Sequence, residues 1–169
     1  MKNAMDEREY QFYIADQLAK NEDKLSELYA LYREKFTFMK KFWDELTEDE
    51  LGHGAWVRTL RKKIEDGTVQ FGEHRFNKDL LEDFYKNVQL QIFEAEKEIS
   101  LVDALRNAVK MEQTMIEKRF FDVFKGDSVE LEILLLALRY STENHLKTVA
   151  DRYKSEIGEM GQGIAAQTA

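Results

Sequence analysis

The 169-residue chain contains neither cysteine nor proline. Without cysteine it cannot form a disulfide bond, a thiol nucleophile, a zinc ribbon or an iron–sulfur cluster. Proline interrupts helices, so its absence favours long helices, as does the low count of eight glycines. At this length we expect one domain, large enough to bury most of the surface that its unfolded chain exposes.

Basic charge and long apolar runs are also scarce. The chain has 33 acidic and 25 basic residues, and its net charge of −8 argues against a nucleic-acid partner. The longest apolar run, Ile133 to Leu138, is far too short to cross a bilayer, and the first nine residues lack the apolar core of a signal peptide. We therefore expect a soluble, cytoplasmic protein without a membrane partner.

Apolar residues recur every three or four positions along most of the chain, which is the period of helices that bury one face. This period predicts helices over residues 7–36, 39–65, 78–97, 101–125 and 128–156. The first two are joined by so short a connection that we expect them to be antiparallel neighbours. The third is long enough to return the chain along a bundle, and we interpret it as a crossover.

The predicted fold class is therefore all-α. Residues 1–157 are expected to form one antiparallel four-helix bundle, with a helical crossover between the second and third main helices. Residues 158–169 are small and polar, and we expect them to form a flexible C-terminal tail. His74, in the predicted loop 69–77, is expected to be a solvated loop residue.

Two polar residues interrupt the apolar face of the helix predicted over 39–65. Between Leu46 and Val57, the next positions on that face are Glu50 and His53. Burying both without partners would cost several kcal/mol or would protonate the glutamate. A bound cation is the simplest solution, because carboxylate and neutral imidazole are ligands for iron, manganese and zinc. A second interpretation is that Thr47 begins a capping box that ends at Glu50, although the apolar face continues through Thr47 without a break.

Polar residues also fall on the inward faces of the other main helices, and they repeat one pattern in both predicted hairpins. The pattern is an acid followed by a segment that ends in histidine. It consists of Glu22 and Glu50-x-x-His53 in the first hairpin, and of Glu112 and Thr142-x-x-His145 in the second, where a threonine replaces the second acid. Five of these six positions hold a side chain that can bind a metal. In a four-helix bundle they would converge at mid-height, and they match the ligand set of di-iron carboxylate bundles.

These motifs resemble the ferritin-like superfamily, and among its branches the rubrerythrin-like di-iron domains. The similarity is carried by Leu18-Ala19-x-x-Glu22-x-x-Leu25-x-x-Leu28-Tyr29, Phe42-Trp43-x-x-Leu46-x-x-Asp49-Glu50-x-x-His53, Ala104-Leu105-x-x-Ala108-x-x-x-Glu112 and His145. It covers residues 10–155 and is more specific in the first hairpin than in the second.

The resemblance implies a di-iron site that reacts with O2 or peroxide, often in a homodimer. By position, Glu22 would be a terminal ligand, Glu50 and Glu112 bridging carboxylates, and His53 and His145 terminal imidazoles. The implied enzyme is a di-iron oxidase or peroxidase, an oxidoreductase. The implied cofactor is two iron ions, or one if the second position is lost, with manganese or zinc as alternatives.

The chain departs from the rubrerythrin pattern in two ways. Thr142 stands in place of an acid, so an ion at His145 would need Glu143 or water to complete its ligands, and Glu143 more naturally pairs with Lys147. The metal position formed by Glu22, Glu50 and His53, with help from Glu112, is therefore better supported than the position at His145. Without cysteine there is also no rubredoxin-type centre, so electrons must come from an external donor.

A second function therefore stays open: a ferritin-like bundle without catalysis that serves as a binding or assembly module. The segment 131–138 is apolar on nearly every side and predicts a second buried face, against the crossover helix or a second subunit. Four aromatic residues near the expected site are interpreted as core rather than as electron relays: Tyr29, Tyr32, Trp43 and Trp56.

Overall fold

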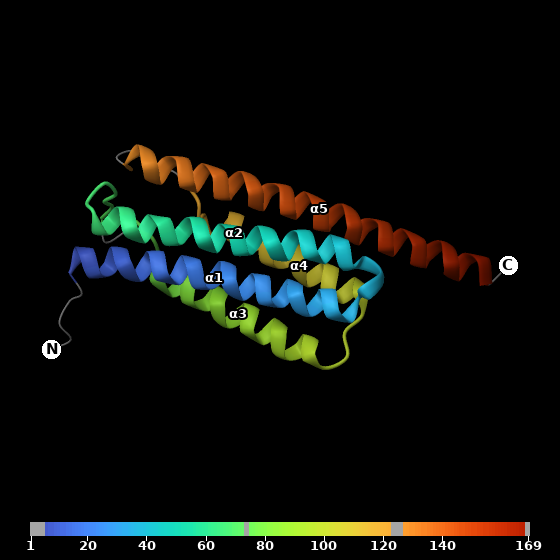
Figure 1. The fold of residues 1–169 in the computed structure, drawn as a ribbon. Helices are drawn as coiled ribbons and strands as arrows, with labels where there is room; N and C mark the ends of the chain where they lie inside the picture. The colour runs from blue at the N-terminus through green and yellow to red at the C-terminus, as the bar shows by residue number, and fades with distance from the viewer. Residues whose placement is uncertain (1–5, 73–74, 123–126, 168–169) are drawn as a thin grey trace.

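The computed structural model describes residues 6–72, 75–122 and 127–167, with side chains up to residue 159. Its elements are all helical (Figure 1): α1 (Glu7–Lys35), the 3-10 turn η1 (Thr37–Met39), α2 (Lys40–Glu65), α3 (Lys78–Glu96), α4 (Leu101–Glu117) and α5 (Val129–Gln167). The prediction of an all-α chain is confirmed. His74 lies outside the described residues, so its expected place in a solvated loop is not tested.

α1 packs antiparallel to α2, and α4 packs antiparallel to α5. α3 packs along α1 in the same direction, because Tyr10 bonds to Phe76 before the start of α3 and Lys35 bonds to Lys97 after its end. α1 and α2 form the first hairpin, α4 and α5 form the second, and α2 contacts α5 across the space between the hairpins. α3 carries the chain from one hairpin to the other and lies along α1, on the side away from α5 (Figure 1). Four main helices thus surround one interior.

Side chains cap the starts of three helices where the chain leaves a loop. Asp6 accepts a hydrogen bond from the backbone of α1, Asn77 from that of α3, and Ser100 from that of α4. The capping box that would begin at Thr47 does not form. Thr47 lies inside α2, where its hydroxyl donates to the carbonyl of Trp43 at 2.7 Å. Glu50 is therefore an interior residue of a long helix, and its burial needs another explanation.

α4 ends at Glu117, eight residues before the predicted end near Lys125. Arg119 adopts a left-handed conformation with φ of 60°. The backbone N–H of Phe120 then donates to the carbonyl of Met115 at 3.2 Å, which closes the helix as a Schellman motif. Glycine usually occupies the left-handed position of this motif, so an arginine there gives no recognisable stop signal.

α5 continues to Gln167, past the predicted end at Glu156 and past the ends of the other helices (Figure 1). The tail predicted over 158–169 is thus helical as far as Gln167, and the last two residues lie outside the described part of the chain. Within the described chain, none of the helices combines the length and the hydropathy that a membrane span requires.

Aromatic side chains fill the interior next to the turn between α1 and α2. Tyr29, Tyr32 and Trp43 are fully buried, with Trp43 5.9 Å from the ring of Tyr29 and 5.0 Å from that of Tyr32. Their interpretation as core residues is confirmed. Trp56 is 47% exposed, so the same interpretation is wrong for that residue.

Candidate metal centre

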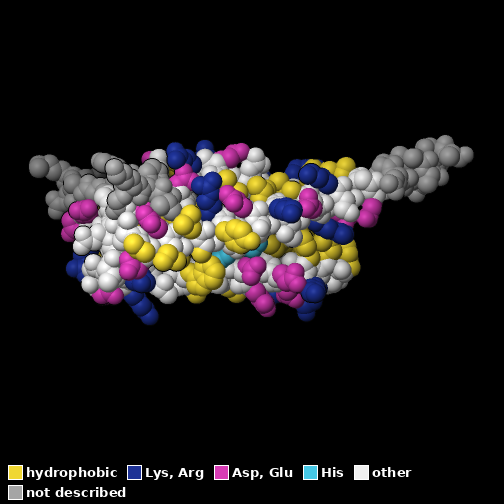
Figure 2. Space-filling view, turned by 90° about the horizontal axis from the view of Figure 1, so that it is seen from above, with side chains coloured by type: hydrophobic (Ala, Val, Ile, Leu, Met, Phe, Trp, Pro, Cys, Tyr) yellow, Lys and Arg dark blue, Asp and Glu magenta, His cyan; other side chains and the backbone are white. Residues whose placement is uncertain are grey.

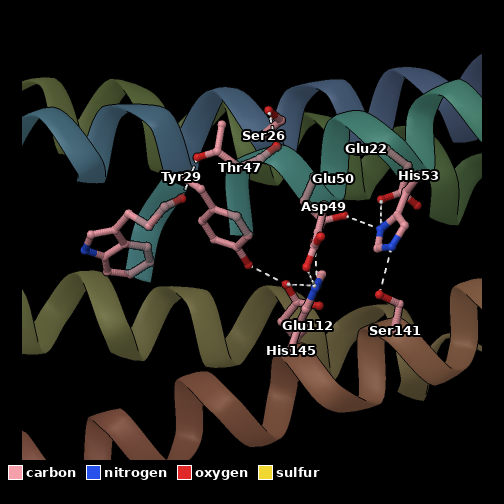
Figure 3. A network of polar contacts seen from close by, with 11 residues as sticks. Glu22, Ser26, Tyr29, Thr47, Asp49, Glu50, His53, Glu112, Ser141 and His145 are labelled. Carbon is pink, nitrogen blue, oxygen red and sulfur yellow. Dashed lines mark hydrogen bonds and ion pairs between the residues drawn. The ribbon is translucent and has the colours of Figure 1, made fainter. Parts of the chain in front are cut away.

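Five polar side chains from all four main helices meet in the interior (Figure 3). They are Glu22 of α1, Glu50 and His53 of α2, Glu112 of α4 and His145 of α5. None is more than 5% exposed. The structure therefore brings together five of the six residues predicted as metal ligands. Most of the neighbouring buried residues are apolar, so the cluster interrupts a largely hydrophobic core.

Glu50 lies at the centre of this cluster and contacts both histidines. Its Oε2 is 2.7 Å from Nδ1 of His53, and its Oε1 is 2.9 Å from Nδ1 of His145. The two imidazole rings are 5.4 Å apart, centroid to centroid. The ligand atoms of these three residues all lie within 4.8 Å of one another, so the group can hold a metal ion.

The other two acids lie on either side of Glu50, one beside each histidine. Glu22 Oε2 is 3.8 Å from Nδ1 of His53, and Glu112 Oε1 is 3.8 Å from Nδ1 of His145. The cluster thus has two halves, each made of one outer glutamate and one histidine, and both share Glu50. The sequence favours the half at His53, whereas these distances are the same in both halves.

Two carboxylate oxygens in the cluster lack hydrogen-bond partners. Among the described residues, four buried side-chain atoms are unpartnered, and two of them are Oε2 of Glu22 and Oε2 of Glu112. A buried polar atom without a partner is costly, and a carboxylate oxygen more so. A cation in each half would satisfy both atoms, so the residues present fit a metal centre.

Burial and mutual contacts shift the pKa of every acid in the cluster. Burial raises the pKa of Glu22 to about 8, although His53 opposes it, and burial with repulsion from Glu50 raises that of Glu112 to about 8. Burial alone would also raise the pKa of Glu50. Hydrogen bonds from His145 and His53 outweigh it and lower the pKa of Glu50 to about 2.

Burial acts on the pKa of the two histidines in the opposite direction, because it disfavours their charged form. Burial lowers the pKa of each, but the acids beside them prevail, so that the pKa of His53 is raised to about 10 and that of His145 to about 9. Near neutral pH the metal-free cluster therefore holds protons on both histidines and on the two outer acids, while Glu50 is ionised. A metal that binds there must displace protons.

Three further side chains hold the cluster from outside. His53 Nε2 is 2.9 Å from the hydroxyl of Ser141, His145 Nε2 is 3.1 Å from Oδ2 of Asp49, and the hydroxyl of Tyr29 donates to Oε1 of Glu112 at 2.5 Å (Figure 3). Because each Nε2 faces outward to a partner, each Nδ1 is directed at the acids. The sequence gives no signal for Ser141, whereas Asp49 stands next to Glu50 in the motif.

Glu143, the sixth predicted ligand, lies outside the cluster. Its side chain is 48% exposed and pairs with Arg139 at 3.0 Å, one turn earlier in α5, rather than with Lys147 as predicted. Thr142 is 2% exposed and lies one turn before His145. The fourth helix therefore brings one histidine and no carboxylate to the site.

No family model matches the chain, and no curated protein or solved structure is significantly similar to it. The resemblance to the ferritin-like superfamily thus gains no support from these comparisons. Function must be inferred from the geometry and chemistry of the site.

Proposed function

We propose that the protein binds transition-metal ions, iron first, in the buried carboxylate–histidine cluster, and that it is an oxidoreductase acting on O2 or peroxide. The observation that carries this proposal is the pair of unpartnered oxygens on Glu22 and Glu112, enclosed in a core that also buries Glu50 and two histidines. Iron bound here would supply electrons for the reduction of O2 or peroxide, and an external donor would restore them.

The donor set narrows the choice of metal. Carboxylate oxygen and imidazole nitrogen, with no thiolate in the chain, suit iron, manganese and zinc. The two halves around Glu50 suit a pair of ions: Glu22 and His53 would hold one, Glu112 and His145 would hold the other, and Glu50 would contribute to both. His53 and His145 give up protons when they become ligands, and Tyr29 holds one oxygen of Glu112 in place.

The arrangement of the helices supports a ferritin-like fold for residues 1–157. Two antiparallel hairpins face each other, a helix crosses between them, and each hairpin brings an acid and a histidine into the buried cluster. Di-iron carboxylate bundles place their ligands in this way. Fold alone does not establish chemistry, so metal binding has to be measured directly.

Metal content after anaerobic Fe(II) loading tests the proposal. We expect about two equivalents of iron in the wild type, followed by a near-ultraviolet absorption band on exposure to air. Glu50→Ala should lose most of this iron, because both halves share Glu50. Glu143→Ala is the matched control, since Glu143 is an acid on the surface of α5 and should leave loading unchanged. Absence of stoichiometric iron from the wild type would contradict the proposal.

The second candidate function, an assembly module, is favoured by one observation on α5. Four apolar side chains that are 56–69% exposed follow each other at steps of four, three and four residues and form one outward face: Val129, Ile133, Leu136 and Tyr140. Hydrophobic side chains gather on this side of the molecule (Figure 2). Soluble monomers rarely leave such a stripe uncovered.

A second copy of the chain is the partner that fits this stripe. Antiparallel packing of two α5 helices would set Val129 against Tyr140 and would bring Glu132 near Arg139 of the partner subunit, which pairs opposite charges. We expect a homodimer in sedimentation velocity, and Leu136→Glu should shift it to monomer. Leu90→Glu is the matched control, because Leu90 is 53% exposed on α3, away from the stripe, and should leave the dimer intact. A wild type that sediments as a monomer at high concentration would exclude this interface.

A further inference from the structure

Thr142 occupies the position where the symmetry of the site calls for an acid. Glu50 lies one turn before His53 in α2, and Thr142 lies one turn before His145 in α5. Glu50 is fully buried and Thr142 is 2% exposed, so both belong to the interior. The two halves are otherwise matched, with an outer glutamate at 3.8 Å from each histidine. The site is therefore one carboxylate short.

The missing carboxylate leaves a charge unbalanced once both halves hold divalent ions. Three acids, Glu22, Glu50 and Glu112, then face four positive charges. Tyr29 adds no negative charge, because its hydroxyl donates a hydrogen bond to Oε1 of Glu112. Asp49 is nearby, but its side chain is 60% exposed, and water screens its charge. One net positive charge remains in a buried site, which is unfavourable unless an anion accompanies it.

We infer that a small monoanion completes the metal-loaded site at the position of Thr142, and that the protein therefore takes an anionic ligand or substrate of about the size of formate. The size follows from the comparison of side chains, since a glutamate there would end in a carboxylate of three heavy atoms that threonine lacks. The inference rests on the proposed metal binding.

The cluster comes nearest to the surface on the side where α2 faces α5. Histidine side chains show at the surface of that side in Figure 2, and His145 is 5% exposed there. Trp56, which is 47% exposed, lies over His53 on this side, with its ring 5.5 Å from the imidazole. On the opposite side the cluster is covered by the aromatic core at Tyr29 and Trp43.

Cobalt binding in the presence and absence of formate tests the inference without any turnover. Co²⁺ is the probe because its absorption bands report ligand changes and because air does not oxidise it readily in such sites. For the wild type, formate should tighten the second Co²⁺ equivalent by about tenfold, the size of a typical coupling between two ligands, and should shift the visible bands. Azide, which has three heavy atoms and one negative charge, should act in the same way.

Two variants of Thr142 separate charge from shape. Thr142→Glu supplies the missing carboxylate, so it should bind both Co²⁺ ions without formate and lose the formate response. Thr142→Val keeps the size of threonine without adding charge, so its formate response should remain. A formate response in Thr142→Glu equal to that of the wild type, or its loss in Thr142→Val, would overturn the inference.

The outcomes also distinguish this inference from the proposed function. Two Co²⁺ ions bound with no effect of formate or azide on affinity or spectrum would overturn the anion site alone. A wild type that binds no Co²⁺ and no Fe²⁺ would overturn the proposed function, and the anion site with it.

Discussion

Raising the pH should destabilise the metal-free protein and leave the metal-loaded protein almost unchanged. The pKa values of Glu22 and Glu112 are raised to about 8, and those of His53 and His145 to about 10 and about 9. A raised pKa contributes stability below the pKa of the unfolded group, and this stability is lost as the pH rises through the folded value. Glu50 has the opposite sign, because its pKa is lowered to about 2, so its contribution is lost only in acid.

The two outer acids, Glu22 and Glu112, by themselves set a lower bound on the loss of unfolding free energy as the pH rises. Between about pH 6 and pH 7.5 the unfolded acids are ionised while Glu22 and Glu112 keep their protons in the folded state. For each such proton, a rise of one pH unit lowers the free energy of unfolding by about 1.4 kcal/mol. The two acids together therefore lower it by about 3 kcal/mol per pH unit. For a chain of this length, that corresponds to a fall of about 6–12 °C in melting temperature per pH unit.

Thermal unfolding followed by circular dichroism measures this slope, with EDTA in one series and excess Co²⁺ in the other. Bound metal replaces the protons, so the loaded protein should melt at nearly the same temperature over this range. The double variant Glu22→Gln/Glu112→Gln is the control, because an amide mimics the protonated acid and does not ionise. Its metal-free slope should lose the share of the two acids, about 3 kcal/mol per pH unit, and keep that of the histidines. A metal-free wild type whose melting temperature stays constant or rises with pH would refute the assigned charge states.

Two further predictions concern residues beside the cluster. Asp49→Asn keeps the shape but weakens the hold on Nε2 of His145, and should lower Co²⁺ affinity by about 10- to 100-fold in a competitive titration, with little change in melting temperature. Gly52→Ala should stabilise the protein by about 1 kcal/mol in urea unfolding, because a methyl group there would meet nothing within 4 Å. Gly54→Ala should gain less, since its methyl group would lie 2.7 Å from a carboxylate oxygen of Asp23.

The parts of the fold that follow from local pattern could be predicted from the sequence. The helix predicted over 78–97 is observed as Lys78–Glu96, because its apolar period and its cap at Asn77 are both local signals. The end of α4 could not be predicted. Arg119 takes the left-handed conformation that usually requires glycine, so the sequence carries no stop signal there. The sequence predicts too short an α5, because small polar residues such as Gly158 indicate a tail, yet the helix continues to Gln167.

The candidate site was predictable to the extent that it breaks the apolar period. Glu22, Glu112 and His145 each occupy an inward position where a hydrophobic residue is expected, and all three are buried in the cluster. The contact of Ser141 with His53 could not be predicted, because it depends on how closely α5 approaches α2. Only its place next to the missing acid makes Glu143 a predicted ligand, and its position on the surface of α5 directs it to Arg139.

The two candidate functions differ in what they require of the interior. A bundle that only docks a partner needs its outer stripe on α5, and its core would be at least as stable with apolar side chains in place of buried ionisable ones. Instead, the core encloses Glu22, Glu50 and Glu112 with two histidines, and it leaves two oxygens without partners. Such a cluster is destabilising by itself and becomes favourable when cations enter it. The interior therefore supports the metal-dependent function, and the stripe on α5 is compatible with it, because a dimer formed through that face leaves the cluster inside each subunit intact.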